Sequence, residues 1–242
     1  MLSKNELKYI QSLCQKKQRA EEGLFIAEGT RLVDELLQSH YPVKKVFALA
    51  DWLAANPLLK IPVQEITAAE LSKISLLQTP HQVLAIVEQK NPGALPEKTN
   101  AFTLIVDGIQ DPGNMGTIIR IADWFGIKQI VASTDTVELY NPKLIQATMG
   151  SFIRVSVHYT SLETYLQNCP VPVFGALLEG KSLYEQLSVP EAMLIIGNEA
   201  RGIRASLLPL ITNPVTIPRI GGAESLNAAV AAGIIVSHLK GK

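Results

Sequence analysis

Two turns in the last quarter of the sequence carry polar side chains that could take part in catalysis. Met193–Ile196 is apolar and runs directly into Gly197-Asn198-Glu199, and Val215–Ile217 runs into a turn that ends at Ser225-Leu226-Asn227. An apolar run followed by a polar, glycine-containing turn is typical of a buried strand and the loop that leaves it. Because such loops hold the ligands of α/β folds, we expect a carboxylate, a hydroxyl and an amide near one binding site.

A third loop of the same kind spans Asp107–Arg120 and contains three glycines. We expect Asn114 to open a helix whose N-terminus offers backbone N–H groups to an anion. Arg120 follows within two turns, and its apolar neighbours predict that the guanidinium has a partner. The loop matches neither a Walker A sequence nor G-x-G-x-x-G, which argues against nucleoside triphosphate and ordinary dinucleotide sites.

The elements around these loops alternate between strand and helix patterns, which predicts a parallel sheet flanked by helices. The last helix should begin at Ser225, a natural N-cap residue. Tight turns and a capped core helix would also explain each motif taken alone. The expected strands are 102–106, 129–132, 154–158, 173–177, 193–196 and 215–217, and the expected helices are 114–125, 142–149 and 225–239.

The first ninety residues repeat the alternation with shorter elements and predict a small α/β sandwich. The segment that follows is polar, with Pro92, Gly93 and Pro96, as expected of a linker. We therefore expect domains at 1–90 and 101–242, joined by a linker at 91–100. The expected helices of the first domain are 4–13, 30–37 and 67–74, the last capped by Thr67, and its strands are 23–27, 43–49 and 83–87.

Composition indicates an ordinary globular protein, with 242 residues, 47% hydrophobic residues and no net charge. Its N-terminus is too charged for a secretory signal and no apolar run is long enough to span a membrane, so we expect a cytoplasmic location. Cys14 and Cys169 are far apart and lack nearby histidines, which argues against a zinc site or a disulfide framework. Residues 1–19 hold five cations and one carboxylate, a pattern that can meet phosphates, although a solvated helix face is its commoner meaning.

Three motifs in order resemble the signature of the SpoU/TrmH family of RNA 2′-O-ribose methyltransferases. They are Asn114-x-Gly116-x-x-x-Arg120, Gly197-Asn198-Glu199-x-x-Gly202, and Ile217-Pro218 with Glu224-Ser225-Leu226-Asn227. The segment from Asn141-Pro142-Lys143 to Met149-Gly150 is similar to the part of the family that lies between them. Phe25-x-x-Glu28-Gly29-x-Arg31-Leu32-Val33 resembles the family's amino-terminal substrate-binding domain, which has a ribosomal-protein-like fold.

The resemblance implies an α/β domain whose chain tail passes through a loop, forming a deep trefoil knot, one of the rare exceptions to the rule against knots. It also implies a homodimer that binds S-adenosylmethionine through main-chain groups. By match to the motifs, Gly197, Ile217 and Leu226 should contact the cofactor, with the loop after Leu177 closing over it. No metal ion is expected.

The implied reaction transfers a methyl group to a ribose 2′-hydroxyl. We expect Arg120 to clamp an RNA phosphate and stabilise the developing alkoxide, because a guanidinium that stays protonated cannot act as a base. Asn114, Ser225 and Asn227 should hold the ribose and one another. Glu199 should fix its loop by accepting backbone donors and is also a candidate to orient Arg120, from the same or the partner subunit, with a role as base in reserve.

For the first domain we expect phosphate contacts from Lys16, Lys17, Arg19 and Arg31. The separate first domain favours ribosomal (23S) RNA over transfer RNA as the substrate. Two other interpretations are a catalytically inactive RNA-binding homologue and a small-molecule enzyme on an open doubly wound sheet. The intact motif residues argue against the first, and the missing phosphate fingerprint argues against the second.

Overall fold

The computed structural model describes residues 1–241, which divide into two compact units. The first unit consists of Met1–Asn91 together with Leu139–Ile153. The second consists of Pro92–Glu138 and the chain from Arg154 onward. A short stretch from the middle of the chain therefore belongs with the first unit, which sequence patterns did not indicate.

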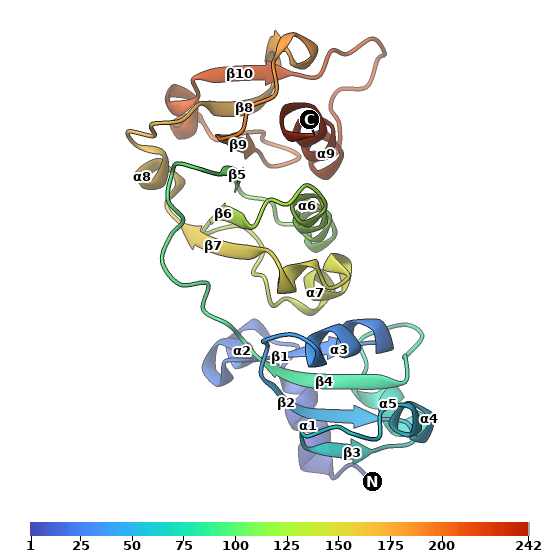
Figure 1. The fold of residues 1–242 in the computed structure, drawn as a ribbon. Coiled ribbons are helices and arrows are strands. Elements are labelled where there is room, and N and C mark those ends of the chain that lie inside the picture. The colour runs from blue at the N-terminus through green and yellow to red at the C-terminus, as the bar shows by residue number, and fades with distance from the viewer. Residues whose placement is uncertain (242) are drawn as a thin grey trace. The chain divides into compact units, whose positions relative to one another are not determined.

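The sheet of the first unit is mixed, in the order β1-β4-β2-β3, with β4 antiparallel to both of its neighbours (Figure 1). Each strand or helix expected in the first ninety residues is present within two residues of its predicted bounds. Thr67 caps its helix in a capping box with Glu70, as predicted. The strands are β1 (Leu24–Glu28), β2 (Val43–Ala48), β3 (Val63–Glu65) and β4 (Val83–Glu88), and the helices are α1 (Lys4–Ser12), α2 (Lys16–Glu22), α3 (Thr30–Leu37), α4 (Ala50–Ala55) and α5 (Ala68–Ile74).

The segment Leu139–Ile153 contains α7 (Pro142–Thr148) and packs against β1. Gln146 Nε2 donates to the Glu28 carbonyl at 2.9 Å. The Phe25 ring lies 4.7 Å from the Tyr140 ring and 5.9 Å from the Phe152 ring, measured between centroids. Aromatic contacts of this kind add to the burial of apolar surface, so the segment completes the core of the first unit.

The sheet of the second unit is parallel throughout, in the order β10-β8-β9-β5-β6-β7, which confirms the predicted fold class (Figure 1). Every residue of β5 and β9 is buried, as expected of central parallel strands covered on both faces. The strands are β5 (Phe102–Val106), β6 (Gln129–Ser133), β7 (Ser156–Thr160), β8 (Val173–Ser182), β9 (Ala192–Ile196) and β10 (Asn213–Thr216).

Helices cover this sheet. Leu162 and Tyr165 of α8 (Leu162–Leu166) pack with Leu207 against one face. The long helices α6 (Pro112–Trp124) and α9 (Ala228–Lys240) pack against each other. Within residues 1–241, no helix combines the length and the apolar character that a membrane crossing requires.

Candidate functional site

The three motif loops leave the same edge of the parallel sheet. β5, β9 and β10 end at Val106, Ile196 and Thr216, and the loops that carry the motifs follow directly. Because β5 pairs with β9, β9 with β8, and β8 with β10, all in parallel, their carboxyl ends point the same way. This is the edge at which α/β sheets place ligands.

Asn114 is the point at which the three motifs meet. Its Nδ2 donates to Glu199 Oε1 at 2.6 Å, and its Oδ1 accepts from Asn227 Nδ2 at 2.8 Å. These side chains come from α6, the loop after β9 and the start of α9, so a single amide joins positions 85 and 113 residues away in sequence. The structure thus brings three of the five candidate catalytic residues into one hydrogen-bonded chain.

The helix starts at the site differ from those predicted. Asp111, not Asn114, caps α6 by accepting from the Asn114 N–H at 2.8 Å. Asn227, not Ser225, caps α9, since its Oδ1 accepts from the N–H groups of Ala229 and Val230 at 3.0 and 3.2 Å. Ser225 lies exposed in the preceding loop. Both aspartate and asparagine are strong caps, and in each case the competing residue lies two or three positions away.

Replacing Asn227 with alanine should destabilise the protein by about 1 kcal/mol, the usual cost of losing a helix N-cap. Chemical denaturation in urea measures this change. Ser225→Ala is the matched control, because that hydroxyl caps nothing, and we expect a change below about 0.5 kcal/mol there. Equal effects of the two substitutions would contradict the assignment of Asn227 as the cap.

Arg120 lies on the exposed side of α6, although its neighbours Ile119 and Ile118 are buried. In the described part of the chain its guanidinium makes no hydrogen bond or ion pair. The apolar flank predicted a partner for this guanidinium, and no such partner lies within residues 1–241. The apolar neighbours face the sheet, and helical geometry turns Arg120 away from them.

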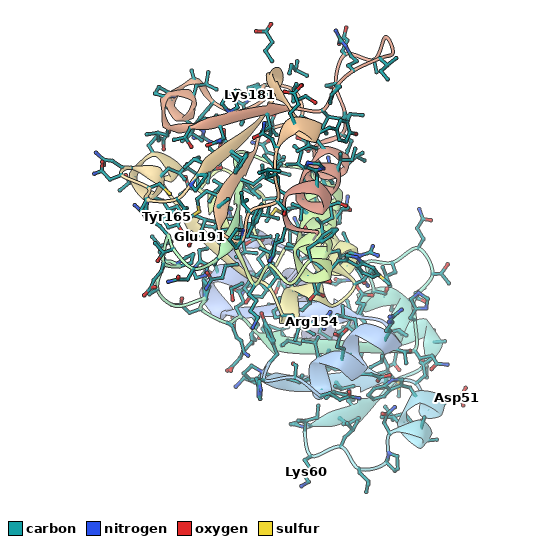
Figure 2. All side chains as sticks on the ribbon, turned by 45° about the horizontal axis from the view of Figure 1, so that its top comes forward. Asp51, Lys60, Arg154, Tyr165, Lys181 and Glu191 are labelled. Atoms are coloured by element: carbon teal, nitrogen blue, oxygen red, sulfur yellow. The ribbon has the colours of Figure 1, made fainter. Side chains whose placement is uncertain are left out.

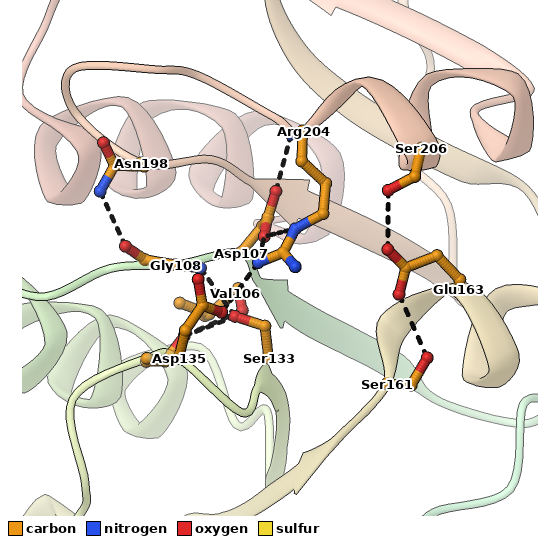
Figure 3. A network of polar contacts seen from close by, with 11 residues as sticks. Val106, Asp107, Gly108, Ser133, Asp135, Ser161, Glu163, Asn198, Arg204 and Ser206 are labelled. Carbon is orange, nitrogen blue, oxygen red and sulfur yellow. Dashed lines mark hydrogen bonds and ion pairs between the residues drawn. The ribbon is translucent and has the colours of Figure 1, made fainter.

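Asn198, rather than Glu199, fixes the backbone of the loop after β9. Asn198 Oδ1 accepts from the N–H groups of Ala200 and Arg201 at 3.0 and 3.2 Å, and its Nδ2 donates to the Gly108 carbonyl at 2.7 Å (Figure 3). The carboxylate of Glu199 accepts from Asn114 instead. The prediction that Glu199 accepts backbone donors was wrong, and its neighbour has that role.

A charged network holds the far end of the same loop (Figure 3). Asp107, only 2% exposed, accepts from the backbone N–H of Arg204 at 2.8 Å and from Arg204 Nε at 2.6 Å. Arg204 also donates to Asp135 Oδ1 at 2.8 Å. Hydrogen bonds from the Ser133 hydroxyl and then from Arg204 lower the pKa of Asp135, and the hydrogen bonds that Arg204 donates to Asp107 and Asp135 raise the pKa of Arg204.

Sequence reasoning assigned no role to Asp107, Asn198 or Arg204. The available signal was the aspartate directly after the buried run Phe102–Val106, because a charge at the end of a buried strand needs a partner. Nothing in the sequence pairs that aspartate with a residue 97 positions away.

Gly197 allows the loop to fold back onto its own main chain. A Cβ atom at this position would lie 2.3 Å from the Gly202 carbonyl carbon and 2.4 Å from the Ile203 nitrogen. The backbones of Asn198 and Gly202 also exchange two hydrogen bonds, at 3.0 and 2.9 Å. Only glycine fits this approach, so the turn presents main-chain atoms at the carboxyl edge of the sheet.

The remaining predicted cofactor residues lie along neighbouring strands and loops. Leu177 is half-buried in the middle of β8, which continues to Ser182, so the expectation of a loop directly after Leu177 was wrong. Ile217 directly follows β10, and Leu226 is exposed in the loop before α9. Within residues 1–241, the main-chain N–H groups of Ile217 and Leu226 donate no hydrogen bond. The loops at the carboxyl ends of the strands therefore offer backbone N–H groups without an acceptor, together with a turn at Gly197 that has no room for a Cβ atom.

The basic residues of the first unit divide into exposed and buried ones. Lys16 and Lys17 are exposed on α2, and Arg31 is exposed on α3. Arg19 is only 2% exposed, and its Nη1 donates to the carbonyls of Leu13 at 2.9 Å and Cys14 at 2.7 Å. The structure therefore corrects the prediction for Arg19, which joins α1 to α2 and cannot reach an RNA phosphate.

The fold and the site define an α/β protein with its ligand loops at one end of a parallel sheet. Residues 101–237 match the model of the SpoU rRNA methylase family, and residues 4–85 match that of the MRM3-like substrate-binding domain. The chain belongs to the SpoU rRNA methylase family, as the motifs predicted.

Several relatives match over nearly the whole chain. The 23S rRNA (guanosine(2553)-2′-O)-methyltransferase RlmP of Bacillus subtilis is 33% identical, with 93% of this chain and 92% of the relative covered. A TrmH-family protein from Porphyromonas gingivalis is 37% identical, with a TM-score of 0.85 over 98% of this chain and 97% of its own. The S-adenosylmethionine-bound rRNA methyltransferase from Sinorhizobium meliloti is 29% identical, with a TM-score of 0.85 over 98% and 94%.

Proposed function

We propose that the protein methylates a ribose 2′-hydroxyl of 23S ribosomal RNA, with S-adenosylmethionine as the methyl donor. The observation that carries this proposal is the hydrogen-bonded chain Asn227–Asn114–Glu199, which joins the three family motifs at one edge of the sheet. The reaction agrees with that of the relatives named for 23S rRNA 2′-O-methylation, which match over more than nine-tenths of this chain.

The first unit supports ribosomal rather than transfer RNA as the substrate. A structure described in terms of 2′-OH methylation of C/U34 on transfer RNA matches with a TM-score of 0.52 and covers 59% of this chain but 99% of its own. About two-fifths of the present chain has no counterpart there. The ribosomal RNA enzymes RlmP of Bacillus subtilis and RlmB of Coxiella burnetii cover 93% and 91% of this chain.

The edge that holds Gly197, Ile217 and Leu226 fits a cofactor bound mainly through main-chain groups. The close approach at Gly197 and the open N–H groups of the other two residues support this assignment. When bound, S-adenosylmethionine supplies a methyl group on a positively charged sulfur. We place these loops in a trefoil knot and Leu177 at the edge of the cofactor site.

The side chains around Asn114 suit an in-line transfer to a hydroxyl. Asn114 and Asn227 hold each other and orient the ribose, with Ser225 in the same loop as a further hydrogen-bonding group. Arg120, which is exposed and without a partner in the described chain, contacts the neighbouring RNA phosphate and stabilises the alkoxide as it forms. The proton passes to phosphate or water, because a guanidinium does not accept it.

Glu199 acts by positioning Asn114, and its substitution separates this role from that of a base. Glu199→Gln keeps an oxygen that accepts from Asn114, so we expect turnover to fall by about fivefold, as when a charge-assisted hydrogen bond becomes a neutral one. The pH dependence of turnover should not change. A loss of several hundredfold with normal cofactor binding would show that the carboxylate is the base.

We also propose a homodimer that works in the cytoplasm. Trp124 at the end of α6 is 85% exposed and Val230 on α9 is 51% exposed, and these two helices pack together. Large apolar side chains exposed on paired helices are typical of a protein interface. Light scattering of the purified protein should give twice the mass of the chain, and a monomer would contradict the proposal.

Transfer of isotope from labelled S-adenosylmethionine tests the function. We expect label to enter unmodified 23S rRNA at one ribose, and mapping of ribose methylation in cells with and without the protein should find the same position. Label in transfer RNA alone would show that the substrate is transfer RNA rather than ribosomal RNA. No transfer, with normal binding of RNA, would indicate an inactive RNA-binding homologue.

A further inference from the structure

The first unit contains a cavity of about 440 Å³ at the carboxyl end of β1. Its walls come from the start of α3, the segment before β4, and α7 with the residue that follows it. A volume in this range is typical of small-ligand sites, which span roughly 300–1,000 Å³. The lining side chains include Thr30, Arg31, Leu77, His81, Gln146 and Met149.

One end of the cavity suits an anion. Gly29 takes a φ of +100°, provides no capping side chain and turns the chain into α3. In the described chain, the N–H groups of Thr30 and Arg31 donate to no acceptor, and the exposed Arg31 guanidinium forms no ion pair. Open N–H groups at a helix start and a guanidinium fork are both preferred partners of phosphate.

The carboxylate in the wall of the cavity is already engaged. Glu28 is buried, its Oε2 accepts from the Ser75 hydroxyl at 2.5 Å and its Oε1 accepts from the Leu76 N–H at 2.9 Å. Both oxygens therefore hold the segment that brings Leu77 to the wall. The positive end of the cavity belongs to Arg31 and the start of α3.

The lining around His81 suits a flat, partly apolar ring. His81 lies beside Gly29, at 3.8 Å from where a Cβ would be, and Leu77 adds apolar surface. Met149 is 52% exposed and takes a φ of +50°, which is uncommon for a residue other than glycine. Aromatic rings, and thioethers at their edges, are favourable neighbours for nucleobases.

Gln146 adds a group that can recognise a base edge. Its Nε2 donates to the Glu28 carbonyl at 2.9 Å, which fixes the amide at the wall. The amide oxygen and the second N–H bond remain for a ligand, since a glutamine offers two donors and an acceptor. Gln146 and Met149 lie in the part of the sequence that matches the methylase family, so both family segments contribute to this one cavity.

We propose that this cavity binds one unpaired nucleotide of the RNA substrate, with its phosphate at Arg31 and the start of α3 and its base beside His81. The proposal rests on the proposed function, because it assigns part of the recognition of ribosomal RNA to the first unit. Unpaired nucleotides splayed out of loops are the usual targets of sequence-specific RNA recognition. The cavity thus selects a bulged or looped nucleotide rather than a continuous duplex.

Substitution of the proposed phosphate and base contacts tests the proposal with unmodified 23S rRNA transcript in filter binding. We expect Arg31→Ala and His81→Ala each to weaken binding by about tenfold, and only Arg31→Ala to lower the slope of affinity against salt, by about one unit. Lys60→Ala is the control, because it removes a cation of the first unit in the loop between α4 and β3, outside the cavity (Figure 2). Wild-type-like binding by both cavity variants would overturn the proposal.

A nucleotide probe separates the cavity from the methyl-transfer activity. In protein with isotope-labelled methionine methyl groups, 5′-uridine monophosphate should shift the Met149 signal and leave the buried Met115 and Met193 signals in place. The same shift with inorganic phosphate at equal affinity would mean an anion site without base recognition and would overturn the proposal. A Met149 response in a protein that fails to methylate 23S rRNA would support the cavity and refute the proposed function.

Discussion

Replacing Arg120 with lysine should lower the rate of methyl transfer by about 100-fold, the usual effect of removing a group that stabilises developing negative charge. Lysine keeps the positive charge but loses the planar fork that holds a phosphate with two hydrogen bonds. Because Arg120 is exposed and makes no contact that the described fold depends on, stability should change by less than about 0.5 kcal/mol. Single-turnover transfer to 23S rRNA and urea denaturation measure the two effects separately.

Arg154→Lys is a matched control for this substitution. Arg154 is also exposed in the second unit, but its guanidinium binds Asp123, with Nε–Oδ2 and Nη2–Oδ2 distances of 2.9 and 2.7 Å. It follows the short 3-10 helix Ser151–Ile153 rather than a motif loop, so its loss should leave transfer unchanged within about twofold. Near-normal turnover of the Arg120→Lys protein would remove Arg120 from the chemistry.

Gly197→Ala should abolish most cofactor binding and lower the stability of the protein. The added methyl group would lie within 2.4 Å of the backbone at Gly202 and Ile203, where no flexible side chain can move aside. Forcing atoms into packed structure costs about 1–3 kcal/mol, and a similar displacement of the cofactor loop would weaken affinity by at least about tenfold. Urea denaturation and calorimetry with S-adenosylmethionine measure the two losses.

Gly221→Ala provides the control in a neighbouring loop. A Cβ at Gly221 would meet no atom within 4 Å, so the same chemical change should affect neither stability nor binding. If the two glycine variants bound the cofactor equally well, the turn at Gly197 would have no part in the site.

Hydrophobic patterns predicted the larger elements because each buries one face or a whole strand. The all-buried strands β5 and β9 and the capped helix α5 appear as continuous or periodic apolar runs. Short elements gave no such signal. α2 is almost entirely polar, and β3 has three residues of which none is buried. Contacts with other parts of the first unit, rather than their own apolar pattern, stabilise these two elements.

The sequence predicted which residues form the site but not the hydrogen bonds that they make. Motif spacing identified Asn114, Glu199 and Asn227, which the structure joins by hydrogen bonds. The sequence alone does not show which of two suitable N-cap residues, Ser225 or Asn227, caps α9, because this depends on the residue at which the chain enters the helix. It also cannot tell a buried arginine from an exposed one, and Arg19 satisfies two carbonyls inside the first unit.

The placement of Leu139–Ile153 with the first unit limits how the two halves of the chain can be separated or exchanged. A fragment that stops in the 91–100 segment would lose the Tyr140 and Phe152 rings that cover Phe25, and would expose an aromatic surface to solvent. Grafting a different recognition module onto this enzyme therefore requires redesign of α7 as well.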